Sequence, residues 1–297
     1  MKIAVTGSHG FIGTALAAHL RAGGDTVVPV VRGDAGPGEI SWDPRAARLD
    51  PDDLRGMDAI VHLAGAGIGD KRWSDGRREE LQASRIVSTE LLSRVAGLVE
   101  PHPPVLLSGS AIGYYGDGGD EELTEASAAG TGFLADLCRR WEGATAAAEE
   151  AGIRVVHLRS GVVLGRAGGA LAKQLPLFRL GLGGRLGSGR QYLSWIAIED
   201  EVRAIAFALR TPALRGAANL TAPAPATSAA FATALGAVLR RPARLPVPAA
   251  ALRLVLGRDL ADEMLLGGQR VLPAALLAQG FTFTHPTLDE ALRAAIA

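Results

Sequence analysis

Cysteine is almost absent from this sequence: Cys138 is the single thiol among 297 residues. One thiol excludes an intramolecular disulfide and any cysteine-rich metal site. Long apolar runs are absent as well, and without a stretch of about 18 apolar residues we expect no transmembrane helix. The apolar run at the N-terminus ends at a glycine turn after a few residues, which is too short for a signal peptide. Together these absences predict a cytoplasmic protein.

An excess of charge of either sign is also missing. Lys and Arg together number 31, as do Asp and Glu, so the formal net charge is zero. A neutral chain gives no reason to expect a nucleic-acid partner or binding to an anionic membrane surface. The length and the 48% of hydrophobic residues suit one large α/β domain, or such a domain with a smaller lobe.

What the sequence does contain, at its very start, is a glycine turn of the kind that binds dinucleotides. Residues 2–6 are an apolar run typical of a strand, and Gly7, Gly10 and Gly13 follow it before an amphipathic pattern. Gly7 permits the sharp turn, and Gly10 lets the backbone approach a pyrophosphate. Gly13 lets the following helix pack closely on the sheet.

The helix after this turn begins near Phe11 and Ile12, whose free N–H groups would face the phosphates at the positive end of the helix dipole. The glycine spacing is G-x-x-G-x-x-G rather than G-x-G-x-x-G, so a plain tight turn is the alternative. A strand before the turn, a helix after it and a second strand beyond favour the nucleotide site.

The second strand, at residues 26–31, decides our prediction of the cofactor. In a dinucleotide-binding fold the end of this strand meets the adenosine ribose, and here Val31 and Arg32 occupy it. An acidic residue would bind a free 2′-hydroxyl, whereas an arginine favours a 2′-phosphate. Asp34 lies two residues further on, in a Gly/Pro loop. We therefore predict NADP rather than NAD, with a solvated surface arginine as the alternative.

A further strand is predicted at residues 58–64, and Leu63, Ala64 and Gly65 stand at its end. The small residues leave room for a cofactor against the strand end. We interpret His62, inside this strand, as a packed core histidine rather than a catalytic base.

The strand predicted at residues 104–107 ends in a hydroxyl-rich segment that runs from Ser108 to Gly116. Open α/β sheets place their chemistry at the C-terminal ends of parallel strands. We expect one long helix over residues 77–98 and helical structure over residues 133–151.

The most glycine-dense stretch, residues 181–189, has two interpretations. It either wraps a substrate with backbone N–H groups or forms a flexible surface loop.

The alternation of strands and helices predicts a Rossmann-type α/β fold with a doubly wound, mainly parallel sheet and a smaller C-terminal α/β lobe. The NADP-binding domain is expected over residues 1–165 with part of 190–225. The substrate-side lobe is expected over residues 166–297, and the cleft between the two would hold the substrate.

Several motifs along the chain carry a resemblance to a known family. They are Thr6-Gly7-x-x-Gly10-x-x-Gly13, His62-Leu63-Ala64-Gly65, Arg72-Trp73, Ser84-Arg85, Ser110-Ala111-x-Gly113-Tyr114-Tyr115-Gly116, Trp141-Glu142, the Arg159 to Gly165 segment, the Gly181 to Gly189 segment, and Ser194-Trp195-Ile196. Together they resemble the extended short-chain dehydrogenase/reductase superfamily, and more narrowly its atypical SDR39U1-like subgroup of epimerase family proteins. Residues at about 245–293 resemble the small tail domain of that subgroup.

The resemblance implies hydride transfer assisted by a Tyr-x-x-x-Lys pair and a serine. The sequence has three tyrosines and three lysines, and no pair of them has that spacing. If Glu142 is the acidic residue that commonly follows the pair, the positions of its tyrosine and lysine fall on Leu134 and Cys138. Leucine has no proton to transfer, and we interpret Cys138 as a packing residue. The superfamily's ordinary mechanism therefore cannot be transferred to this chain.

Other residues could still carry chemistry. Ser108 and Ser110 lie where the resemblance places the carbonyl-polarising serine. Tyr114 or Tyr115 could supply a phenolic proton, with core packing or a cofactor wall as the alternative for both.

Two charged residues of the predicted helix 77–98 are implied cofactor contacts. Arg85 stands in the place of an asparagine that lies under the nicotinamide in the extended group, and Glu80 precedes it by about one turn. The alternative is an exposed ion pair between them. Lys71 or Arg85 could also lower the pKa of the catalytic tyrosine.

We therefore predict an NADP-dependent atypical short-chain oxidoreductase or epimerase that acts on a small carbonyl, alcohol or nucleotide-sugar substrate. No nucleic-acid or membrane partner is expected, and a homodimer is left open. The alternative function is a catalytically silent NADP-binding protein whose loaded state is read by a partner; the missing Tyr-x-x-x-Lys pair favours it.

Overall fold

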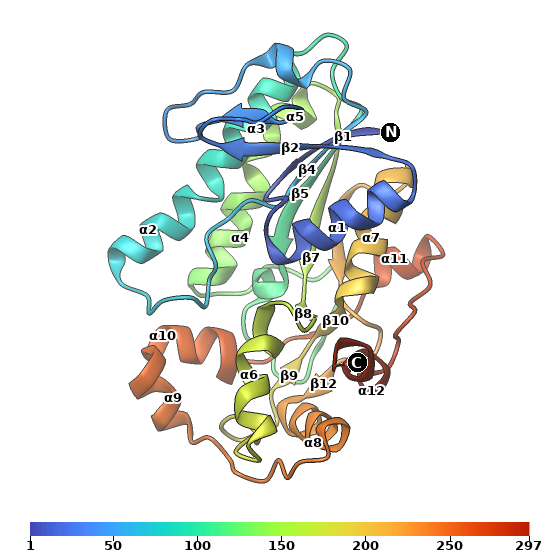
Figure 1. The fold of residues 1–297 in the computed structure, drawn as a ribbon. Coiled ribbons are helices and arrows are strands. Elements are labelled where there is room, and N and C mark those ends of the chain that lie inside the picture. Colours follow the sequence, from blue (N-terminus) through green and yellow to red (C-terminus); the bar gives the residue numbers. More distant parts are fainter. Residues whose placement is uncertain (297) are drawn as a thin grey trace.

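The computed structural model describes residues 1–296, and a parallel sheet of seven strands runs through its centre (Figure 1). The spatial order is β3-β2-β1-β4-β5-β7-β11, and every neighbouring pair is parallel. The strands are β1 (Lys2–Thr6), β2 (Thr26–Arg32), β3 (Ile40–Trp42), β4 (Ala59–His62), β5 (Val105–Ala111), β7 (Arg154–Ser160) and β11 (Gly216–Leu220). The chain passes from β1 to β2 on one side and reaches β4 on the other, so the strand order reverses between β1 and β4. Ligands of open α/β sheets bind at such a reversal.

Helices cover both faces of this sheet, as the unbroken apolar character of its strands requires. One face packs on α1 (Phe11–Ala22), α7 (Ile198–Arg210) and α11 (Ala274–Ala278), and the other on α3 (Ile86–Leu98), α5 (Ala146–Glu150) and the 3₁₀ turn η1 (Pro51–Leu54). The predicted fold class is confirmed.

Two of the predicted helices are each broken in two. The predicted helix at residues 77–98 is α2 (Asp75–Ala83) followed by α3, with the break at Ser84 and Arg85. The predicted helix at residues 133–151 is α4 (Phe133–Gly143) followed by α5. The prediction of one long helix at residues 77–98 is wrong, because the side chain of Arg85 bonds a distant loop. Residues 133–151 are helical as predicted, apart from a break at Ala144 and Thr145, where Thr145 bonds neighbouring elements.

A smaller layer lies beyond the C-terminal ends of the strands (Figure 1). Its own core, built around Trp195, Phe178 and Phe231, joins the parallel pair β8–β10 to three helices. These elements are β8 (Val162–Leu164), β10 (Trp195–Ala197), α6 (Gly169–Arg179), α8 (Ser228–Leu239) and α12 (Leu288–Ile296).

Short elements complete the chain. They are the 3₁₀ turn η2 (Ile112–Tyr115), the pairs β6 (Glu122–Leu123) with β13 (Arg270–Val271) and β9 (Tyr192–Leu193) with β12 (Ala226–Thr227), and the run α9 (Ala249–Leu256), α10 (Arg258–Ala261) and η3 (Asp262–Leu266). In the part of the chain that the structure describes, no helix is long and apolar enough to cross a membrane.

Candidate functional site

The turn between β1 and α1 requires glycine at two of its three glycine positions. Gly7 has a φ of +69°, and a Cβ added there would lie 2.8 Å from the carbonyl carbon of Leu63. A Cβ on Gly13 would lie 2.1 Å from the carbonyl oxygen of Gly7. The turn is therefore pressed against the end of β4 on one side and against α1 on the other. This is the close packing that the glycine spacing predicts.

The same turn leaves donors free for an anion. No side chain caps α1 at Gly10, and the first helical hydrogen bond runs from the N–H of Thr14 to the carbonyl of Gly10. The N–H groups of Phe11 and Ile12 therefore stand at the uncapped positive end of the helix dipole. The hydroxyl of Ser8 is buried without a hydrogen-bond partner among residues 1–296. These groups fit the pyrophosphate of a dinucleotide.

A chain of buried hydrogen bonds fixes the strand ends beneath the turn. Thr6 Oγ1 accepts hydrogen bonds of 3.2 Å from the N–H groups of both Leu63 and Ala64, and its own hydroxyl lies 2.6 Å from His62 Nδ1. His62 Nε2 lies 3.2 Å from Ser88 Oγ. Burial, together with the charge of Arg85, lowers the pKa of His62 to about 3. His62 is thus a neutral core histidine, as predicted, and it locks β1 to β4.

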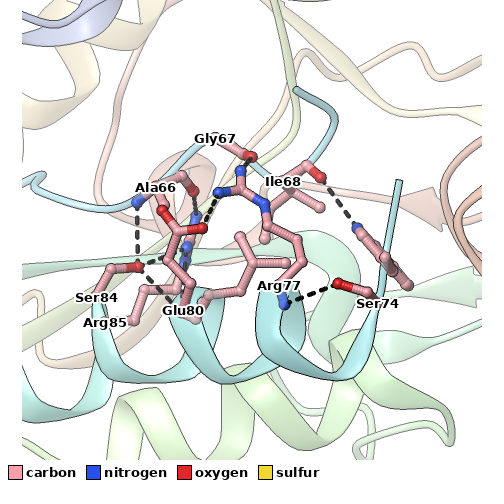
Figure 2. A network of polar contacts seen from close by, with 10 residues as sticks. Ala66, Gly67, Ile68, Ser74, Arg77, Glu80, Ser84 and Arg85 are labelled. Atoms are coloured by element: carbon pink, nitrogen blue, oxygen red, sulfur yellow. Dashed lines mark hydrogen bonds and ion pairs between the residues drawn. The ribbon is translucent and has the colours of Figure 1, made fainter. Parts of the chain in front are cut away.

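Two arginines hold the loop that follows β4 (Figure 2). Arg85 is buried and donates a 2.8 Å hydrogen bond to the carbonyl of Ala66, while Arg77 donates to the carbonyl of Gly67. Glu80 lies on the exposed side of α2 and pairs with Arg77 at 2.6 Å, so the alternative of an ion pair between Glu80 and Arg85 is wrong. A Cβ on Gly65 would lie 3.2 Å from the Arg85 guanidinium carbon, so the loop packs closely against this side chain.

Arg32 stands at the end of β2, next to the partly buried Val31. Its side chain is exposed and makes no hydrogen bond or ion pair with any of residues 1–296. Asp34 is exposed in the loop beyond it. An unpaired guanidinium at the ribose end of the site is available for a phosphate group.

The first four residues of the hydroxyl-rich segment belong to β5 itself, and the next four form the 3₁₀ turn η2. β5 continues to Ala111, with Ser110 in register with Arg159 of β7. Ser108 is fully buried inside the sheet, whereas Ser110 retains 6% exposure. Ser110 Oγ donates a 2.7 Å hydrogen bond to Glu142 of α4.

Glu142 is in turn held by Arg159. The guanidinium makes two hydrogen bonds of 2.8 Å to the two carboxylate oxygens. Burial acts to raise the pKa of Glu142, but the hydrogen bonds and charge of Arg159 outweigh it and hold the pKa below its ordinary value. Glu142 is therefore a stable carboxylate that orients Ser110.

The two tyrosines of η2 have different environments. Tyr115 is buried, donates a 2.8 Å hydrogen bond to Asn219 and accepts one of 2.9 Å from Arg159. Burial raises its pKa despite the nearby Arg159. Tyr114 is only partly buried, and the Arg159 guanidinium carbon lies 3.5 Å from its ring centroid.

The cation beside these tyrosines is therefore Arg159. The prediction that Lys71 or Arg85 lies next to the catalytic tyrosine is wrong. Lys71 is exposed in the loop after β4. Arg85 is turned toward Ala66 and stacks over Trp141, with its guanidinium carbon 5.1 Å from the ring centroid.

The two positions of the missing Tyr-x-x-x-Lys pair are filled by packing residues. Cys138 is buried, as a packing residue should be, and burial raises the pKa of its thiol to about 12. The Cβ of Leu134 lies 3.2 Å from the position of a Cβ on Gly113, between α4 and η2. The region that carries the base in ordinary family members is apolar here.

Glycines of two later segments serve close packing. The ring of Phe11 lies against Gly165 and Gly168 in the loop after β8, where a Cβ at either glycine would be 2.7 Å from a ring atom. A Cβ on Gly184 would lie 1.9 Å from the carbonyl oxygen of Leu245. The glycine-dense stretch is thus packed against the chain that leads into the tail rather than free in solvent.

Sequence reasoning missed the roles of Ser8, Arg77, Glu142, Arg159 and Asn219. Glu142 and Arg159 both belong to motifs of the family resemblance. Their ion pair could not be predicted, because it joins α4 to β7 and depends on the tertiary fold. Ser8, between two of the glycines of the turn, could have been found from its position, because a hydroxyl within such a turn is placed to bind an anion.

The chain belongs to the NAD dependent epimerase/dehydratase family, whose model matches residues 3–219, and a domain of unknown function (DUF1731) matches residues 247–295. It is 49% identical to the epimerase family protein MT2273 of Mycobacterium tuberculosis over 98% of this chain and 96% of the relative. Among solved structures it is similar to human epimerase family protein SDR39U1 with NADPH, with a TM-score of 0.93, 39% identity and 99% of each chain covered. It is also similar to a nucleoside-diphosphate sugar epimerase from Corynebacterium glutamicum, with a TM-score of 0.82 and 35% identity over the whole of this chain and 58% of that one. The predicted resemblance is confirmed.

Proposed function

We propose that this chain is an NADP-dependent oxidoreductase or epimerase that acts on a small carbonyl, alcohol or nucleotide-sugar substrate at the ends of β5 and β7. The observation that carries the proposal is the buried Ser110–Glu142–Arg159 network, which lies at the ends of β5 and β7 on the same edge of the sheet as the glycine turn. A buried ion pair is often no more stabilising than well-packed apolar residues of the same volume. Its presence at the strand ends, where parallel sheets place their active sites, therefore favours a role in function over a role in stability alone.

The cofactor part of the proposal rests on the glycine turn and on Arg32. The turn, the N-terminus of α1 and Ser8 would hold the pyrophosphate, and Arg32 would pair with a 2′-phosphate. The NADPH bound to the human relative supports the same choice. When bound, this cofactor would donate or accept a hydride at its nicotinamide.

The loop after β4 would form one wall of that site. Leu63, Ala64 and Gly65 present small or apolar groups next to the turn, and Arg85 supports them from behind. In this arrangement Arg85 and Glu80 shape the loop, with Glu80 acting through its ion pair with Arg77.

Ser110 and Tyr114 would meet the substrate. Because the Ser110 hydroxyl donates its hydrogen bond to Glu142, its oxygen remains free to accept a hydrogen bond from a substrate hydroxyl. Tyr115 is committed to Asn219 and Arg159, so Tyr114 is the better placed of the two tyrosines to exchange a proton with the substrate.

A catalytically silent NADP-binding protein is the second candidate. Leu134 and Cys138, which replace the proton-transfer pair by apolar packing, favour it. In that case the Ser110–Glu142–Arg159 network would only stabilise the strand ends, and a partner would recognise the NADP-bound form of the protein.

Transfer of label separates the two candidates. The wild type, Ser110→Ala and Tyr114→Phe are incubated with NADPH deuterated at the nicotinamide C4 and a panel of carbonyl compounds and nucleotide sugars. The enzyme proposal predicts deuterium in a product with the wild type. It predicts at least about tenfold less with Tyr114→Phe, since a positioned acid or base contributes about 10²–10⁴-fold, and a smaller loss with Ser110→Ala, which removes one hydrogen bond to the substrate. Tight NADPH binding without transfer to any metabolite would establish the silent protein instead.

A further inference from the structure

The zero net charge of the chain conceals a strongly asymmetric distribution. Residues 166–258 contain 13 Lys and Arg but only three acidic residues, Glu199, Asp200 and Glu201, which are consecutive at the start of α7. Asp200 and Glu201 are buried, and Glu199 pairs with His285. Basic side chains therefore greatly outnumber acidic ones in this stretch, although Lys173, Arg203, Arg210, Arg253 and Arg258 are ion-paired.

The basic side chains are densest where two segments lie side by side. The N–H of Leu245 donates to the carbonyl of Gly183, and that of Val247 donates to the carbonyl of Arg185. Together these segments, 177–185 and 240–245, carry five exposed arginines that make no ion pair within residues 1–296: Arg179, Arg185, Arg240, Arg241 and Arg244. We call this region the Arg-Leu surface.

Exposed leucines are interspersed with these arginines. The exposed fractions are 53% for Leu177, 73% for Leu180, 50% for Leu182 and 52% for Leu245. Leu182 donates its N–H to the carbonyl of Leu177 across Gly181, whose φ is +73°. This is the 6→1 bond that ends a helix in a Schellman motif, and it brings Leu177 and Leu182 together at the end of α6.

Three kinds of partner are disfavoured by this composition. A second copy seated on the same surface by two-fold symmetry would oppose arginines to arginines. A nucleic acid would find no exposed aromatic ring in these segments on which to stack a base. A protein partner would be anchored mainly by leucine, a residue that is under-represented among interface hot spots.

We propose that the Arg-Leu surface binds the surface of an anionic membrane. Leucine side chains would enter the boundary between headgroups and acyl chains, while the neighbouring arginines would lie at the depth of the lipid phosphates. The alternation Arg179-Leu180 and Arg244-Leu245 places each leucine beside a guanidinium. Such binding is peripheral.

Flotation with lipid vesicles tests the proposal on the full chain. The wild type is mixed with vesicles of phosphatidylcholine alone and of phosphatidylcholine with phosphatidylserine. We expect binding to the second kind only, and weaker binding as salt is raised, because salt screens charges near the surface. The variant Arg240→Glu/Arg241→Glu/Arg244→Glu should bind at least about tenfold more weakly, since each basic residue near an anionic surface contributes several-fold to the affinity.

Matched variants keep the outcome unambiguous. Arg21→Glu/Arg94→Glu/Arg215→Glu changes the net charge equally at exposed arginines elsewhere and should leave binding unchanged. Leu180→Ser should weaken binding several-fold, whereas Leu98→Ser, at a leucine that is 65% exposed on α3, should not. NADPH affinity and melting temperature confirm that each variant is folded. Equal loss in both triple variants, or a wild type with no preference for anionic vesicles, overturns the proposal; in the second case an acidic protein becomes the partner to seek.

Discussion

Arg159 holds Glu142 through two hydrogen bonds of 2.8 Å, one from Nε and one from Nη2. The side chains are 5% and 11% exposed. A nearly buried pair with this geometry depends on both partners, because either charge alone would be left uncompensated.

Removal of the guanidinium should therefore be costly. Arg159→Met leaves Glu142 buried without its partner and should lower the free energy of unfolding by about 3–5 kcal/mol. Urea unfolding followed by tryptophan fluorescence measures the change. The control is Arg55→Met, which removes an ion pair whose side chains are 63% and 73% exposed and should cost less than about 1 kcal/mol. Similar losses in the two variants would contradict the proposed importance of the buried pair.

Glu201 should make the stability of the protein depend on pH. The residue is fully buried, accepts a 2.6 Å hydrogen bond from Ser160, and has its other carboxyl oxygen unpartnered within the described residues. Burial raises its pKa to about 8 from the ordinary 4.5, against the smaller opposing effect of Ser160. The folded state then holds a proton that the unfolded state has lost, so this contribution to stability is full below pH 4.5 and is lost as the pH rises through about 8.

Glu201→Gln carries no such proton and keeps an acceptor for Ser160. We expect the variant to match the wild type in thermal stability near pH 4.5 and to exceed it above pH 8, with the gap opening between those values. Glu150→Gln, an equal charge change at an exposed residue of α5, serves as the control. Parallel curves for wild type and Glu201→Gln across the whole range would show that the buried carboxyl is not linked to folding.

Glu263 should control the first turn of α4. Its two carboxylate oxygens accept hydrogen bonds of 3.1 and 2.8 Å from the N–H groups of Phe133 and Leu134, while Gly132 provides no side-chain cap. Glu263→Ala should cost about 1 kcal/mol, the usual effect of losing a helix cap. Hydrogen exchange should accelerate at Phe133 and Leu134 before it does in the rest of α4, and unchanged exchange at these two amides would contradict the capping role.

How much could be predicted from the sequence depended on the range of the interactions. The glycine turn and the sheet came from local patterns, since Gly7 and Gly13 and the apolar runs carry their own signal. The break between α2 and α3 could not be predicted, because the bond from Arg85 to Ala66 spans 19 residues.

The candidate site divides in the same way. The positions of Ser110 and Tyr115 followed from the end of β5, but their partners Glu142 and Asn219 lie 32 and 104 residues away. The hydrophobic periodicity of the sequence does not predict such long-range pairs. They exist because parallel strands and the helix beside them bring their ends to one edge of the sheet.

The most direct measurement is a paired titration of the wild type and Arg32→Ala with NADPH and NADH, followed by nicotinamide fluorescence. We predict that the wild type prefers NADPH and that Arg32→Ala loses about tenfold in NADPH affinity, since a hydrogen bond to a charged group contributes about 1.5–3 kcal/mol. NADH affinity should not change, and Arg94→Ala, at another exposed arginine, should behave as the wild type. Equal binding of both nucleotides, unaffected by Arg32→Ala, would contradict the account and move the ribose contact to Asp34.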